Sequence, residues 1–246
     1  NSQGVVLWDP EGQEYPHMIS YLGDPRSLPP EMEAEIEVLT DDGAVKMPAI
    51  DVFFKKFSDA GLRTGICIRP QRPVRTAYGA GVNQIGLTSR RDRLNNLDAK
   101  IKTAKKRWGC TLFYLDSNIH WRGDPVTIPG AGGYSATVDN QLLKELVERH
   151  PDILLMPEWE TLRTYAYGAP YTQLNYNREI TPPAHVRRAY PGAWFVNNAD
   201  TKTVKEHREA LVGSVQRGNV LYFSGWWNSG ENAVVKAIYE EAKDDE

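Results

Sequence analysis

The chain has 246 residues, of which 41% are hydrophobic and 25% are charged, enough apolar sequence to bury the core of one large globular domain. Its formal net charge is -3, and no Lys/Arg-rich run is interleaved with aromatic residues, so no nucleic-acid partner is expected. No stretch approaches the roughly 18 to 20 apolar residues of a membrane span, so no membrane partner is expected either.

The sequence starts abruptly, with no initiator methionine before the apolar run Val5-Val6-Leu7. This start is what removal of a signal peptide would leave, and it favours an extracellular or periplasmic location. The two cysteines, Cys67 and Cys110, exclude a disulfide scaffold and are interpreted as small buried hydrophobic residues.

Short β-branched or aromatic runs alternate with stretches of helical periodicity along the chain. The predicted strands are residues 4–9, 63–69, 111–116, 153–158, 171–176, 193–198 and 220–225. The predicted helices are residues 49–60, 90–108, 138–150, 182–189, 201–217 and 231–243. This alternation predicts parallel strands with helices packed outside them.

The length and the alternation favour an α/β fold, a (β/α)8 TIM barrel with a missing or irregular first strand. The missing strand is expected upstream of Asn1 rather than within residues 15–39. Five prolines between residues 10 and 30 and the turn Asp41-Asp42-Gly43 predict a long loop over residues 10–48. We therefore expect residues 1–246 to form a single (β/α)-barrel catalytic domain. An open doubly wound sheet is the alternative, although no Gly-x-Gly-x-x-Gly follows a strand.

Carboxylates follow two consecutive predicted strands, where a parallel barrel gathers its catalytic groups. Asp116 ends the first, a position suited to a nucleophile or base, the alternative being a helix cap or a structural ion pair. Glu158 and Glu160 flank Trp159 at the end of the next predicted strand, residues 153–158. Burial against the indole would favour the protonated form of Glu158, which suits a general acid. Alternatively, one glutamate pairs with an arginine as scaffold, and which of them is chemical stays open.

In glycoside hydrolysis, a pair of carboxylates about 5 Å apart retains the configuration of the anomeric carbon. A pair about 6.5 to 9.5 Å apart inverts it. Around the pair, aromatic rings could stack on a sugar while polar side chains form hydrogen bonds with its hydroxyl groups. Some of the aromatic residues could equally be core residues, and the two acids nearest the N-terminus could serve a turn. The candidate substrate-binding residues are Asp9, Glu11, Arg69, Gln71, Asn118, Trp121, Trp159, Tyr165, Asn197, Asn198, Trp226 and Trp227.

Several motifs are absent from the sequence. The five histidines form no His-x-His and no His-Glu-x-x-His, so neither a metal nor another cofactor is expected. No lysine ends a predicted strand, which argues against Schiff-base chemistry.

The turn Ala60-Gly61-Leu62 leads into a predicted strand, a predicted helix ends at Trp108-Gly109, and Phe113-Tyr114-Leu115-Asp116 follows. With this order of motifs, residues 50–118 resemble the middle of α-galactosidase-type and related clan barrels among TIM-barrel glycoside hydrolases. The resemblance implies that Asp116 is the nucleophile and that residues 4–9 are the second strand. Tyr114 stands where those families carry a lysine. The acidic loop after Asp9 also resembles uncharacterised secreted bacterial barrel proteins.

The general acid of the same families lies on the sixth strand, where this chain has Asn175-Tyr176-Asn177 and then Glu179, so Glu158 or Glu160 takes that role here. The sequence thus predicts a monomeric glycoside hydrolase that degrades a poly- or oligosaccharide. A non-catalytic carbohydrate-binding barrel is one alternative. A carbohydrate lyase or isomerase that uses Arg69 with a tyrosine base is the other.

Overall fold

The computed structural model describes residues 3–8, 23–28, 30–75, 82–85, 87–116, 119–120, 135–136, 138–158, 161–173, 182–194, 196–223 and 229–243. Two compact units divide the chain, residues 2–155 and residues 156–246, and each is described by itself. Within the described ranges, no helix is both long and apolar enough to cross a membrane.

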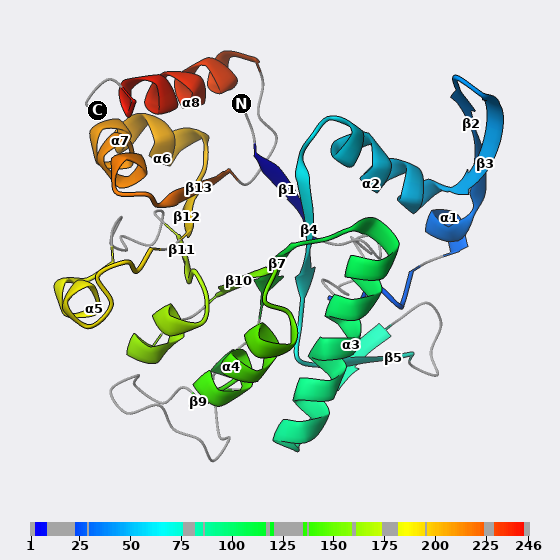
Figure 1. The fold of residues 1–246 in the computed structure, drawn as a ribbon, viewed down its shortest axis with the longest axis horizontal. Coiled ribbons are helices and arrows are strands. Elements are labelled where there is room, and N and C mark those ends of the chain that lie inside the picture. Colours follow the sequence, from blue (N-terminus) through cyan, green and yellow to red (C-terminus); the bar gives the residue numbers. More distant parts are fainter. Residues whose placement is uncertain are drawn as a thin grey trace. The chain divides into compact units, whose positions relative to one another are not determined.

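A four-stranded sheet forms the centre of the first unit (Figure 1). Its strands, in spatial order, are β1 (Gly4–Leu7), β4 (Arg63–Ile68), β7 (Leu112–Leu115) and β10 (Leu154–Pro157). β1 pairs in parallel with β4, and β4 pairs in parallel with β7. β4 is buried from Thr64 to Ile68. Burial of both faces accounts for the apolar run that follows Thr64, because both faces of a parallel sheet are covered.

Three longer helices accompany this sheet, α2 (Ala49–Asp59), α3 (Arg90–Trp108) and α4 (Asn140–Arg149). Side-chain caps set the start of two of them. Ser89 Oγ accepts the Asp92 N–H at 3.0 Å before α3, and Asp139 Oδ1 accepts the Leu142 N–H at 2.8 Å before α4. The covering helices therefore begin where their sequence signals predict.

The second unit contains a parallel sheet of β11 (Tyr171–Gln173), β12 (Val196–Ala199) and β13 (Val220–Phe223). Its helices are η1 (Leu162–Ala166), α5 (Ala184–Ala189), α6 (Thr201–Glu206), α7 (Arg208–Gln216) and α8 (Ser229–Glu241). Ala199, Val204, Leu211 and Ile238 belong to its main hydrophobic cluster. This cluster joins β12 to the helices that follow it.

Each predicted strand and helical stretch overlaps a strand or helix of the structure, although the ends of several predicted strands lie outside the described residues. The fold is mixed α/β with parallel sheets. The stretch predicted as one helix from 201 to 217 is divided at His207, whose backbone (φ -117°, ψ 25°) leaves the helical region between α6 and α7. The described residues form an open four-stranded sheet and an open three-stranded sheet, with no closed barrel among them.

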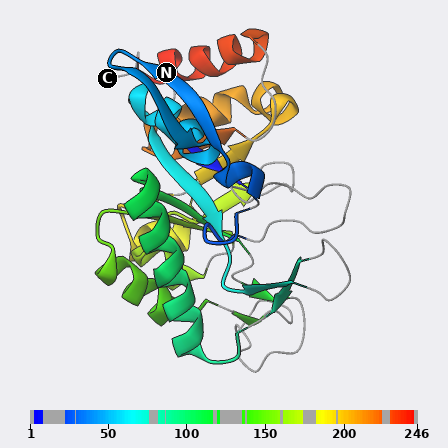
Figure 2. The same ribbon diagram turned by 90° about the vertical axis from the view of Figure 1, so that its right-hand side faces the viewer.

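Residues 30–48 are not the irregular loop that the sequence predicted. They form α1 (Pro30–Glu33) and an antiparallel hairpin of β2 (Glu35–Thr40) and β3 (Gly43–Pro48). The turn at residues 41–43 is correct, but the flanking residues alternate in polarity and pair as strands. The hairpin lies beside α2 in both views (Figures 1 and 2).

Two further antiparallel hairpins follow the central strands. β5 (Arg72–Arg75) pairs with β6 (Val82–Ile85) after β4. β8 (Ile119–His120) pairs with β9 (Ser135–Ala136) after β7. The connections at the carboxyl ends of both strands therefore carry structure that the sequence did not predict.

Arg107 joins α1, α2 and α3. Its guanidinium donates to both carboxylate oxygens of Glu33, at 2.7 and 2.6 Å, and its Nε donates to Asp51 Oδ1 at 2.6 Å. Trp108 Nε1 donates to the same Asp51 oxygen at 2.7 Å. Hydrogen bonding to Arg107 lowers the pKa of Glu33, so this contact holds an ionised carboxylate.

A buried polar pair joins α3 to the end of α4. His150 Nε2 lies 2.9 Å from Asp98 Oδ1, and Lys102 Nζ donates to Asp98 Oδ2 at 2.7 Å. Burial lowers the pKa of His150, against the opposing effect of Asp98. Burial acts to raise the pKa of Asp98, but the hydrogen bonds from Lys102 and His150 together outweigh it and lower that pKa.

We expect this pair to make the fold less stable on acidification. An unfolded histidine titrates near pH ~6.5, and the pKa of His150 is lower in the fold. The contribution of the neutral His150 to the free energy of unfolding is therefore complete above about pH 6.5. It is lost as the pH falls, because the unfolded chain then binds a proton that the folded chain does not. Melting temperature should fall more steeply between about pH 7 and pH 5 for the unmodified chain than for His150→Gln. His185→Gln, at an exposed histidine, should follow the unmodified chain, and equal slopes for all three would refute this expectation.

Candidate functional site

An arginine and an aspartate meet where two neighbouring parallel strands end. Arg69 follows β4 and Asp116 follows β7, directly after the paired residues Ile68 and Leu115. The Asp116 N–H donates to the Ile68 carbonyl at 3.0 Å, which continues the ladder by one bond. The strand register therefore places the two charged residues side by side.

The two side chains form an ion pair, the arrangement that the sequence left open as the alternative to a chemical role for Asp116. Arg69 Nε donates to Asp116 Oδ2 at 2.7 Å, and a second guanidinium N–H contacts the same oxygen. Only 14% of the Arg69 side chain and 9% of the Asp116 side chain are exposed. A charge-assisted contact this far from solvent fixes the position of the carboxylate more firmly than a surface pair would.

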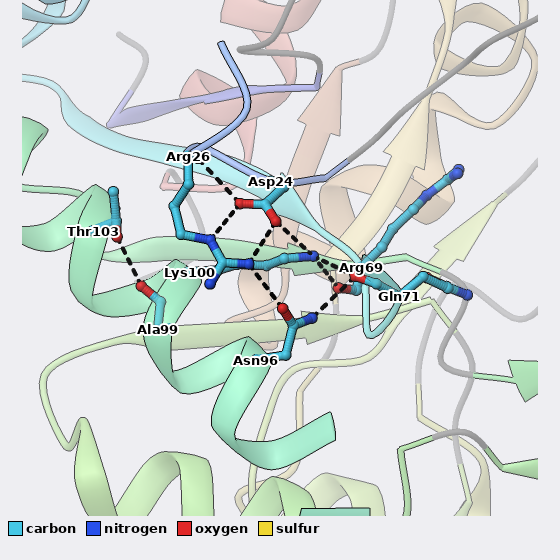
Figure 3. Close-up of polar contacts among 8 residues, drawn as sticks. All are labelled: Asp24, Arg26, Arg69, Gln71, Asn96, Ala99, Lys100 and Thr103. Carbon is cyan, nitrogen blue, oxygen red and sulfur yellow. Dashed lines mark hydrogen bonds and ion pairs between the residues drawn. The ribbon is translucent and has the colours of Figure 1, made fainter. Parts of the chain in front are cut away.

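The backbone that carries Arg69 is held by Lys100, on α3 (Figure 3). Lys100 Nζ donates to the carbonyl oxygens of Arg69, at 2.6 Å, and Gln71, at 2.8 Å. Asn96 Nδ2, one turn earlier on the same helix, donates to the Gln71 carbonyl at 3.0 Å. Pro70 between the two carbonyls has no N–H, so the chain leaves the sheet at this point and its carbonyls need other donors.

Asp24 supplies the negative charge beside this lysine. Its Oδ2 lies 3.8 Å from Lys100 Nζ, and Arg26 donates to its two carboxylate oxygens at 2.7 and 2.6 Å. Arg26 also donates to Asn96 Oδ1 at 2.8 Å. The hydrogen bond to Asp24 raises the pKa of Arg26. Together these contacts link residues 24–26, β4 and α3 in one network.

Gly23 brings this segment against the strand end. Its carbonyl accepts the Arg69 N–H at 3.3 Å, and its φ is 56°. A Cβ at this position would lie 2.6 Å from Arg69 N. Only glycine therefore allows the two backbones to approach so closely.

Two predicted binding residues of the first unit, Arg69 and Gln71, lie within this network. Gln71 Oε1 is buried and has no hydrogen-bond partner among the described residues. A buried acceptor without a partner costs about 1 to 3 kcal/mol of stability. A hydrogen-bond donor from a ligand could therefore bind favourably at Gln71 Oε1.

Tyr114, which stands where the resembled families carry a lysine, is buried in β7. Its ring packs on Trp8 with centroids 4.2 Å apart, so this position contributes an aromatic contact beneath Asp116.

The second unit places its described candidates differently. Glu158 directly follows β10 and is half-buried. Tyr165 is 9% exposed and packs with Val186, while Asn197 is 0% exposed and donates from Nδ2 to Ser214 Oγ at 2.7 Å. Tyr165 and Asn197 are thus interior residues, and no binding role is proposed for them. Asn198 follows on β12 and has a buried Oδ1 with no hydrogen-bond partner in the described ranges.

The remaining candidates lie outside the described residues, and these are Asp9, Glu11, Asn118, Trp121, Trp159, Glu160, Trp226 and Trp227. The part of the chain that the structure covers holds no cluster of three or more His, Cys, Asp or Glu residues arranged to bind a metal ion.

Sequence reasoning missed Lys100, Asp24, Arg26 and Asn96. A signal existed for Lys100, because it falls in the buried stripe of α3 with Leu97, Ile101 and Ala104. A lysine in such a stripe needs buried acceptors. Asp24 and Arg26 lie in a segment that was predicted as loop, where no periodicity marks an inward-facing residue.

No protein-family model matches this chain, and no curated protein matches it. Solved structures similar to it include α-L-fucosidase isoenzyme 1 from Paenibacillus thiaminolyticus, with 13% identity and a TM-score of 0.43 over 80% of this chain and 52% of that chain. Thermotoga maritima α-fucosidase in complex with fucose has 10% identity and a TM-score of 0.44, over 98% of this chain and 52% of that chain.

A third similar structure is a mutant of Kfla1895 in complex with cyclobis-(1->6)-alpha-nigerosyl, with 10% identity and a TM-score of 0.48 over 85% of this chain and 40% of that chain. The chain thus spans about half the length of the fucosidases that it matches. All three TM-scores lie below 0.5, so functional inference starts from the residues of the chain itself.

Proposed function

We propose that this chain is a glycoside hydrolase acting on a poly- or oligosaccharide, with Asp116 as its nucleophile or base. The observation that supports this most is the position of the Asp116 carboxylate at the carboxyl end of β7, beside the end of β4. Catalytic groups of parallel α/β barrels lie at these strand ends, where a rigid sheet holds them. A carboxylate fixed by a guanidinium is positioned to attack or to activate water.

The reaction needs a second carboxyl group as acid. Glu158 and Glu160, which follow the next strand in the order of the first sheet, are the candidates. Separation of the two carboxyl carbons by about 5 Å would give retention, and by about 6.5 to 9.5 Å inversion. In this proposal both sheets belong to one (β/α) barrel, since their strands follow one another in chain order.

Sugar contacts are proposed for the polar and aromatic residues that follow the strands. Gln71 supports this assignment, because its buried Oε1 could accept a hydrogen bond from a sugar hydroxyl. The other proposed contacts are Asp9, Glu11, Asn118, Trp121, Trp159, Asn198, Trp226 and Trp227.

Hydrolysis can be tested directly with the purified chain. We expect release of reducing sugar from at least one member of a panel of polysaccharides and nitrophenyl glycosides that includes α-L-fucosides and α-glucosides. Chromatography of the products identifies the linkage that is cut. Intact substrates throughout the panel, with a folded protein, would count against a hydrolase.

A non-catalytic carbohydrate-binding barrel is the second candidate. The double contact of Arg69 with Asp116 Oδ2 favours it, because a guanidinium withdraws charge from a carboxylate that has to attack. Binding on a glycan array without any released reducing sugar would select this function over hydrolysis.

A further inference from the structure

Lys100 carries a positive charge in the interior of the first unit. Its side chain is 0% exposed, and that of Asp24 beside it is 2% exposed. Removal of an ammonium group from water costs several kcal/mol unless partners replace the lost hydration. An apolar residue would fill the same stripe of α3 without this cost, so the charge needs a specific explanation.

The partners of Lys100 are the carbonyls on either side of Pro70. Nζ binds Arg69 O and Gln71 O, and Asn96 binds Gln71 O from the next turn of α3. A single ammonium group has three donors, and here two of them hold backbone atoms two residues apart. In Figure 3 the Arg69 side chain runs away from Asp24 and Lys100, while its backbone stays within the network.

We propose that Lys100 is a positioning residue for the Arg69–Asp116 pair. The ammonium group fixes the backbone from Arg69 to Gln71 and thereby the point from which the Arg69 side chain reaches Asp116. The ladder between β4 and β7 pairs residues only as far as Ile68 and Leu115, and Asp116 extends it by one bond to the Ile68 carbonyl. The Arg69 and Gln71 carbonyls lie beyond this ladder and are held by Lys100, so loss of the ammonium group releases the Arg69 side of the pair and not the Asp116 side. A functional consequence for turnover rests on the proposed hydrolase activity, whereas the geometric consequence does not.

The test compares Lys100→Met with Lys106→Met in the full chain. Methionine keeps the length of the apolar stem of lysine but removes the ammonium group. Lys106 lies on the same helix and is exposed, so it is a matched control. The readout is the side-chain Nε–H signal of Arg69 in proton–nitrogen spectra, assigned by its disappearance in Arg69→Lys.

In folded Lys100→Met we expect the Arg69 signal to shift or broaden, while Lys106→Met leaves it in place. An unchanged Arg69 signal in folded Lys100→Met would overturn the proposal. Should this variant not fold, Lys100→Gln, which loses the charge but keeps N–H donors, takes its place in the same measurement. Failure of both variants to fold would overturn the positioning role, because Lys100 would then serve the fold as a whole.

Kinetics separate this proposal from the proposed function. On any glycoside that the unmodified chain cleaves, Lys100→Met should lower kcat at least about tenfold with KM within about twofold, as expected when a transition-state contact is misplaced. A KM change alone would contradict this. If the unmodified chain cleaves nothing, the hydrolase proposal fails while the spectrum of Arg69 still decides the role of Lys100.

Discussion

Asp116→Asn is expected to lower turnover of a glycoside by at least about a thousandfold. Asparagine has nearly the same shape as aspartate but can act neither as a nucleophile nor as a base. Its side-chain oxygen can still accept from Arg69, so the fold should persist. The lost charge leaves a largely buried guanidinium less well paired, which should lower the unfolding free energy by about 1 to 3 kcal/mol and the melting temperature by several degrees.

Asp51→Asn is the matched control for this substitution. Asp51 also accepts from an arginine, Arg107, and from Trp108 at 2.7 Å, but it lies on α2 and its partners belong to the last turn of α3. We expect it to destabilise the chain to a similar extent and to leave the specific activity of the folded protein unchanged. Full activity of folded Asp116→Asn, or equal loss of activity in both variants, would rule out a chemical role for Asp116.

Gly65→Ala is expected to have the largest effect on stability. Gly65 is buried in β4 opposite Leu112 of β7. A Cβ there would lie 2.1 Å from the Leu112 carbonyl oxygen and 2.4 Å from its Cβ. Because the backbone of β7 is paired in the sheet and cannot shift without breaking contacts, we expect the free energy of unfolding to fall by about 3 kcal/mol or more. This change lowers the melting temperature by roughly 6 to 12 °C.

Gly192→Ala provides the comparison, since a Cβ at Gly192 meets no atom within 4 Å. It should leave the melting temperature within about 2 °C of that of the unmodified chain, as is usual for surface substitutions. Thermal melts followed by circular dichroism measure both variants. A Gly65→Ala chain as stable as Gly192→Ala would show that β4 and β7 are not packed this closely.

The periodicity of the sequence predicted the elements correctly because most of them are buried on a regular pattern. β7 and the last four residues of β4 are continuous apolar runs, and α4 carries its apolar residues on one face. The β2–β3 hairpin was missed because most of its residues are exposed. The alternation of polar and apolar residues in β2 was a strand signal, but the prolines before it favoured the interpretation as a loop.

The site was predictable only where strand order alone determines it. Arg69 and Asp116 were expected to converge because parallel strands end at one edge, and they form an ion pair there. Lys100 and Asp24 were not predicted, because their contact depends on where a loop folds back onto a helix. Tyr165, also a predicted substrate contact, is buried and packs with Val186, a contact that strand order alone does not determine.

The separation of the Asp116 and Glu158 carboxyl groups, measured by crystallography, tests the central claim of a two-carboxylate site most directly. The glycosidase proposal predicts that the two groups face each other at about 5 to 10 Å. Carboxyl groups that point to different faces of the molecule, or that lie more than about twice that distance apart, would contradict it.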